Sequence, residues 1–246
     1  MSQLALSEIS QTSQRHISYL ESGKSSPSRK MVVNLCDALD VSLNETNQIL
    51  LAAGFAPVYS HYPLEGAELS EINQALSFML ERHQPYPAMV VDNLYDVVRP
   101  NSAAVNFQLF LHGVSDPSDL PPQNLNLMLG LFHPEGYGQF ISNFNEVATS
   151  LLQRFMKELS YAGNPEPGME VLEQIMSCQS FPQSSIQESI SLPVLNVQFK
   201  KGKHKLNLFS IISSFGSPFD VTLEQLKLEC HFPLDSTTKQ FFEKTL

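Results

Sequence analysis

Residues 13–24 read SQRHISYLESGK, a short helical pattern with a polar start and a glycine stop. Ser13 can cap the first turn of this helix by accepting a hydrogen bond from a free backbone N–H. Ile17 and Leu20 lie three positions apart, as on the inner face of a helix. Gly23 suits the left-handed backbone that often follows a helix. The stretch therefore predicts an amphipathic helix whose polar N-terminal side chains face solvent.

A serine-capped apolar segment at residues 2–9 predicts a shorter helix just before this one. Two short helices joined by a tight turn form the helix-turn-helix layout, in which the second helix enters the major groove. At its N-terminus, Gln14 can pair with adenine and Arg15 with guanine, while neighbouring hydroxyl and ammonium groups hold phosphates. The residues predicted to contact double-stranded DNA are Gln3, Ser13, Gln14, Arg15, His16, Ser18, Tyr19 and Lys24.

The charge distribution restricts DNA binding to this region. The 246-residue chain has 25 acidic and 15 basic side chains, a net charge of −10, which excludes a protein that coats nucleic acid over its whole surface. All basic residues of the first 57 positions lie between residues 15 and 30, so this window alone offers a positive patch there. On spacing alone, a small helical dimerisation domain with a solvated polar face remains the alternative.

Cysteine usage and hydropathy indicate the compartment. Cys36, Cys178 and Cys230 lie far apart and form no CxxC pair, which argues against a disulfide framework or a zinc site. No secretory signal opens the sequence, and its apolar runs are too short to cross a bilayer. We therefore expect a cytoplasmic protein with no membrane partner and no bound metal.

Motifs for catalysis are missing. Gly23-Lys24-Ser25 ends like a phosphate-binding loop, but that motif requires glycine at position 18, where Ser18 stands. The sequence has no Gly-x-Ser-x-Gly elbow and no His-Glu-x-x-His pair. We therefore expect no enzyme activity and no cofactor.

The remainder of the chain predicts an α+β domain. Residues 58–67 indicate a linker between a helical domain at 1–57 and a second domain at 68–246. In the second domain, apolar runs at 88–91 and 94–98 predict a hairpin. Helical patterns follow, and after them a polar Ser/Gln loop extends to about residue 191. The C-terminal third predicts strands at 194–199, 206–214 and 221–232.

Apolar side chains of this second domain are candidates for a small-molecule pocket, which is mostly apolar with a few polar anchors. For each of them, plain core packing is the alternative. The predicted ligand-binding residues are Phe78, Tyr86, Met89, Tyr95, Phe107, Phe132, Phe144, Phe209, Ile211 and Phe215.

Beyond these patterns, the chain resembles a known family of regulators. Residues 13–24, together with LLAAGFAP at 50–57, resemble the xenobiotic-response-element (XRE) type of helix-turn-helix regulator. The rest resembles the subgroup with a C-terminal MmyB-like ligand-binding domain, through the strings RHQPYPA (82–88), NSAA (101–104), HPEG (133–136), NFNEVA (143–148) and FGSPFDVTLEQL (215–226).

The resemblance implies a lambda-repressor-like helical domain joined to a PAS-like α+β domain that holds a fatty-acid-like ligand. It also implies a homodimeric transcription regulator, which reads half-sites about 34 Å apart. The family's first helix would precede Ser2 and is missing here, so we expect a truncated helix-turn-helix. The alternatives are a lipid-binding sensor that has lost DNA binding through this truncation and, in third place, an acyl-processing enzyme.

Overall fold

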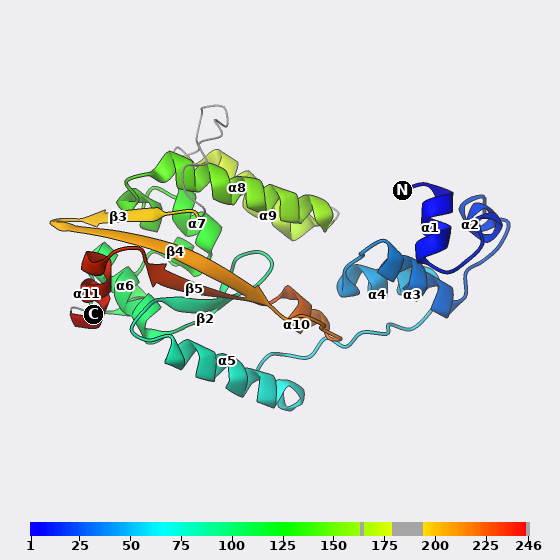
Figure 1. Cartoon of the computed structure of the whole chain (residues 1–246), viewed down its shortest axis with the longest axis horizontal. Coiled ribbons are helices and arrows are strands. Elements are labelled where there is room, and N and C mark those ends of the chain that lie inside the picture. The colour runs from blue at the N-terminus through cyan, green and yellow to red at the C-terminus, as the bar shows by residue number, and fades with distance from the viewer. Residues whose placement is uncertain (163–164, 179–193, 245–246) are drawn as a thin grey trace. The chain divides into compact units, whose positions relative to one another are not determined.

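The computed structural model describes residues 1–162, 165–178 and 194–244 (Figure 1). The predicted Ser/Gln loop lies almost entirely outside these residues. The chain forms two compact units. The helical unit comprises Met1–Leu69 and Phe215–Glu224, and the sheet unit comprises Ser70–Ser214 and Gln225–Leu246.

Four short helices build most of the helical unit. They are α1 (Gln3–Ile9), α2 (Gln14–Glu21), α3 (Arg29–Ala38) and α4 (Leu43–Ala52). A serine caps each of them, and its hydroxyl accepts a hydrogen bond from the backbone N–H three residues later. The caps predicted at Ser2 and Ser13 are confirmed. The small core of the unit is centred on Val32, Cys36 and Leu50.

Residues 215–224 join the helical unit although they lie between two strands of the sheet unit. The backbone N–H of Val221 donates to the carbonyl of Ser60, and the carboxylate of Asp220 accepts from the N–H of Tyr62. The strand predicted over residues 221–232 is wrong at its start, because α10 (Val221–Gln225) occupies the first five positions. Asp220 begins this helix by accepting from the N–H of Thr222.

The sheet unit contains one five-stranded antiparallel sheet in the order β2-β1-β5-β4-β3. Its strands are β1 (Ala88–Val91), β2 (Val97–Pro100), β3 (Val197–Lys201), β4 (His204–Ser214) and β5 (Lys227–Pro233). Its α-helices are α5 (Ser70–Arg82), α6 (Ser102–His112), α7 (Leu127–Phe132), α8 (Phe144–Tyr161), α9 (Glu166–Ser177) and α11 (Ser236–Lys244). The short 3-10 helices are η1 (Ala67–Leu69) in the helical unit, and η2 (Pro117–Asp119), η3 (Pro122–Leu125) and η4 (Tyr137–Phe140) here.

The predicted hairpin of β1 and β2 is confirmed, but its second strand begins at Val97 rather than Leu94. Asp92 starts the turn, since its carboxylate accepts from the backbone N–H groups of Leu94 and Asp96. Tyr95 then takes a left-handed backbone with φ of 68°. The turn is therefore longer than two residues, and it aims Tyr95 into the core.

Helices lie on both sides of the sheet. Figure 1 shows α7, α8 and α9 on one side and α5 on the other. The larger core lies on the side of α7 and α8, and its fully buried rings are those of Tyr95, Phe132, Phe155 and Phe242. The fold is thus the expected α+β domain joined to a helical unit.

Candidate functional site

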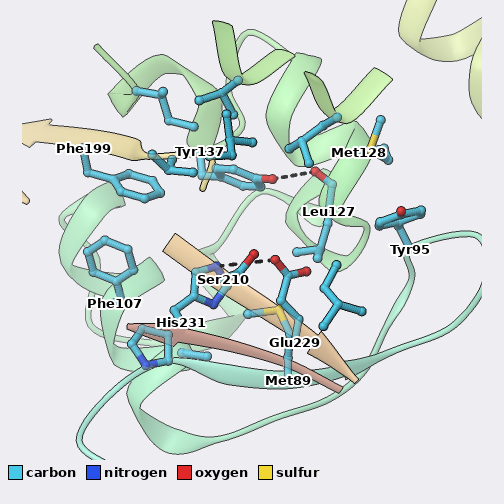
Figure 2. A pocket seen from close by; sticks show the side chains of 18 of the residues that line it. Met89, Tyr95, Phe107, Leu127, Met128, Tyr137, Phe199, Ser210, Glu229 and His231 are labelled. Atoms are coloured by element: carbon cyan, nitrogen blue, oxygen red, sulfur yellow. Dashed lines mark hydrogen bonds and ion pairs between the residues drawn. The ribbon is translucent and has the colours of Figure 1, made fainter. Parts of the chain in front are cut away.

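A cavity of about 480 Å³ lies in the sheet unit between the sheet and the helices α6, α7 and α8 (Figure 2). Its wall is mostly apolar, and the charged side chains among its lining residues belong to two groups, one on β5 and one around Tyr95. The volume falls within the range of about 300–1,000 Å³ that is usual for small-molecule sites.

Strand register decides which sheet residues reach the cavity. Glu229 of β5 pairs with Met89 of β1 and with Ile212 of β4, and His231 pairs with Ser210. Directly paired residues share a face, and residues two apart along a strand share it too. All five side chains therefore belong to the face that lines the cavity.

Aromatic side chains and the helices close the opposite wall. Phe107 of α6 meets Phe199 of β3 edge to face, with ring centroids 5.0 Å apart. Tyr137 of η4 donates its hydroxyl to the carbonyl of Leu127 at 2.7 Å. Burial raises the pKa of Tyr137 far above its usual value, so its phenol stays neutral and keeps this hydrogen bond. The wall is thus held in place by packing and by an internal hydrogen bond.

The first polar group is the pair Glu229 and His231 on β5. Nε2 of His231 lies 3.8 Å from Oε1 of Glu229. Burial lowers the pKa of His231, although the nearby Glu229 carboxylate acts in the opposite direction. The backbone carbonyl of His231 is 2.8 Å from Nε2 of His83. At neutral pH the cavity therefore faces a neutral imidazole beside a carboxyl group.

The second polar group is a network around Tyr95. Nε of Arg154 donates to the Tyr95 hydroxyl at 2.9 Å, and that hydroxyl donates to Oε2 of Glu158 at 2.9 Å. The same carboxylate oxygen accepts from Nζ of Lys227 at 2.7 Å. Burial raises the pKa of Tyr95 well above its usual value, so the phenol remains a donor. Two cations and one carboxylate share this network.

The structure brings three of the ten predicted ligand-binding residues to the cavity, Met89, Tyr95 and Phe107. Three others belong to the surrounding core: Tyr86, Phe132 and Phe144.

The remaining four predicted ligand-binding residues are not part of the lining of this cavity. Phe78 of α5 is 58% exposed. Phe209 and Ile211 alternate with the lining residues of β4, so they point to the other face, where Phe209 stacks on Phe232. Phe215 belongs to the helical unit.

The polar lining residues Ser210, Glu229, His231 and Arg154 were not predicted from the sequence. Glu229 and His231 alternate with apolar residues in a strand pattern, which predicts that they face solvent, so no local signal marked them as cavity residues.

The predicted DNA-contacting residues cluster at α2 and its flanks. Ser13 is the N-cap of α2, and Gln14 and Arg15 form its exposed first turn. Nε of Arg15 donates to the Tyr19 hydroxyl at 2.9 Å, and Nζ of Lys24 lies 5.9 Å from the centre of the same ring.

The other predicted contacts lie on the same two helices. His16 and Ser18 also belong to α2, whereas Gln3 begins α1 and donates to the carboxylate of Glu21 at 2.6 Å. α2 therefore exposes Gln14 and Arg15 at its N-terminal end, and the contacts with Tyr19 hold the Arg15 side chain.

Two other kinds of site were sought in the described part of the chain. No group of three or more His, Cys, Asp or Glu side chains there could hold a metal ion. Across those same residues, no helix has both the length and the apolar character needed to span a membrane.

Comparison with known families gives two matches. The model described as MmyB-like transcription regulator ligand binding domain matches residues 72–244, and the model described as helix-turn-helix matches residues 1–45. These matches confirm the resemblance drawn from the sequence and the predicted fold class. They describe regulator domains and not enzymes. No curated protein matches the chain.

Proposed function

The chain belongs to the family of transcription regulators with an MmyB-like ligand-binding domain, and from this premise we propose what it senses and how. A fatty-acid-like or other apolar small molecule occupies the cavity of the sheet unit and changes the affinity of the helical unit for DNA. The protein acts in the cytoplasm as a homodimer.

The cavity carries this proposal. Aromatic and aliphatic side chains from β1, β3 and three helices enclose it, and burying such a surface against an apolar ligand contributes about 25 cal/mol per Å². Two polar groups, one at Glu229 and His231 and one around Tyr95, lie on this otherwise mostly apolar wall. This arrangement suits binding and orientation of a ligand.

The helical unit supports DNA reading through α2. Its first turn exposes Gln14 and Arg15, which can contact base edges in the major groove. The cation of Arg15 stacks beside the Tyr19 ring at 5.2 Å, and this contact limits the side-chain freedom that binding would otherwise remove.

Chain connectivity offers a route between the two functions. β5 contributes Glu229 and His231 to the cavity, and the residues just before it belong to the helical unit. There the Glu224 carboxylate accepts from the N–H of Leu43 at 2.9 Å, at the start of α4. We propose that a ligand which favours one position of β5 also favours one arrangement of the helical unit.

The second candidate is a sensor without DNA binding. One observation favours it: Leu4 and Ile9 on α1 are 55% and 56% exposed, so this helix leaves apolar surface uncovered. Apolar side chains that stay exposed add no burial free energy to the helical unit.

Fluorescence anisotropy with duplex DNA from upstream of the protein's own gene separates the two candidates. We expect binding that weakens steeply between about 50 and 200 mM salt. Arg15→Ala should cost about 1–3 kcal/mol on the preferred sequence. Arg82→Ala removes an exposed arginine of the sheet unit and should leave binding unchanged. No binding at either salt concentration would favour the second candidate, whereas equal binding by Arg15→Ala and wild type would contradict the role of Arg15 in reading DNA.

A further inference from the structure

The buried end of the cavity holds a carboxyl group without a cation. The side chain of Glu229 is only 9% exposed, and its distance of 3.8 Å to the His231 ring is too long for a hydrogen bond. Among residues 1–162, 165–178 and 194–244, no lysine or arginine forms an ion pair with it. Burying an ionised carboxylate is costly unless a partner compensates its charge.

Two further acceptor groups face the same place. Ser210 lies directly opposite His231 in the β4–β5 pair, and both line the cavity with Glu229 (Figure 2). Nε2 is the nitrogen of the His231 ring on the side of Glu229, 3.8 Å from Oε1 of that carboxyl group. Because burial lowers the pKa of His231, the ring is neutral and one of its nitrogens is an acceptor.

The cations beside the cavity are engaged elsewhere. Lys227 shares the strand face of Glu229, yet its Nζ contacts Glu158 at 2.7 Å. Arg154 donates to Tyr95 and lies over its ring, 5.3 Å from the centroid. Both positive groups thus belong to the network around Tyr95. The carboxyl group of Glu229 has no cationic partner among them, so a bound molecule can supply one.

We infer that the ligand is an apolar amphiphile with a protonated amine, which lies against Glu229, Ser210 and His231. This inference rests on the proposed function, because it names the polar group of the ligand proposed there. An ammonium has three N–H donors for these three acceptors, and hydrogen bonds between ionised groups are about twice as strong as neutral ones.

A free fatty acid fits this end of the cavity poorly in either orientation. With its carboxylate at Glu229, two like charges would meet in a buried place. With its carboxylate at Arg154, the apolar tail would lie against the charge of Glu229 and leave it unpaired.

Isothermal titration of the full chain with decylamine, decanol and decanoate tests the inference. The probes share one apolar chain and differ only in charge and donors. We expect decylamine to bind at least about tenfold more tightly than the other two. Glu229→Gln should remove this preference and weaken decylamine by a similar factor. Glu170→Gln makes the same charge change at an exposed position of α9 and should alter none of the affinities.

Each outcome decides a separate point. Tightest binding of decanoate, equal binding of decylamine and decanol, or unchanged decylamine affinity in a folded Glu229→Gln chain overturns the inference and leaves the proposed function standing. Binding of none of the three probes overturns the proposed apolar sensor itself. The ranking of the probes on the wild-type chain decides the question even where Glu229→Gln does not fold.

Discussion

At the scale of single residues, buried polar side chains connect elements that are far apart in the sequence. Asn101 is buried, and its side-chain oxygen accepts from the backbone N–H groups of Ala88 and Ala104. Its amide nitrogen donates to the carbonyls of Leu80 and Tyr86. One side chain thus caps α6 and ties this helix to β1 and to the end of α5.

Asn101→Ala should destabilise the sheet unit strongly. The change leaves several buried backbone groups without partners, and each such group costs about 1–3 kcal/mol. Asn106→Ala on the exposed side of the same helix is the matched control and should change stability little. Urea unfolding measures both variants, and a loss below 1 kcal/mol for Asn101→Ala, on the order of a single exposed contact, would contradict this role.

His231 should make the stability depend on pH. Because burial lowers its pKa below the ordinary 6.5, the unfolded chain takes up a proton before the folded chain does. The contribution of the neutral His231 to stability is therefore complete above about pH 6.5, and it is lost as the pH falls from there toward the lower pKa of the folded chain.

The fall in Tm between about pH 7.5 and 5.5 should be smaller in His231→Gln than in wild type, since the variant cannot gain this proton. His112, whose pKa burial also lowers, remains in both chains and cancels in the comparison. His61→Gln at an exposed position is the control. Equal falls in wild type and His231→Gln would show that His231 does not contribute.

At the scale of elements, backbone contact between α7 and the turn after it shapes one wall of the cavity. A Cβ on Gly138 would lie 1.9 Å from the carbonyl oxygen of Leu131, and one on Gly136 would lie 2.0 Å from that of Gly130. These glycines let η4 approach α7 closely, and this approach aims Tyr137 at the carbonyl of Leu127.

Gly138→Ala should therefore force η4 away from α7. Such overpacking costs about 1–3 kcal/mol, and the displaced Tyr137 should weaken binding of the decyl probes. Gly216→Ala is the control, because nothing lies within 4 Å of a Cβ there. Thermal unfolding and titration measure the two effects, and wild-type values for Gly138→Ala would show that the contact is not needed.

Local signals explain which elements were predictable. Ser13 capped its helix as expected, since capping depends on only four neighbouring residues. Polar and apolar residues alternate from Gln225 to Phe232, which suited a strand, whereas residues 221–225 form a helix whose start Asp220 caps. The polar end of the cavity depends on cross-strand pairing between β4 and β5, and a single sequence does not show that register.

At the scale of the whole molecule, the cavity and the helix-turn-helix lie in separate units, and the chain passes between these units at residues 69–70, 214–215 and 224–225. Residues 215–224 were predicted as part of a continuous C-terminal domain, whereas in the structure they pack in the helical unit. Their polar contacts join residues more than 150 positions apart, such as Tyr62 and Asp220, and periodicity carries no information about such pairs.

Operator affinity measured with and without a cavity ligand tests the proposed regulation most directly. The protein is titrated with labelled duplex from its own upstream region, in the presence of saturating decylamine, decanol or decanoate. The probe that binds should change the affinity for DNA by about 5-fold or more, the usual range of allosteric coupling. Leu151→Trp, which fills the cavity from α8, should abolish the response. Unchanged operator affinity with a probe that calorimetry shows to be bound would contradict the coupling of the two units.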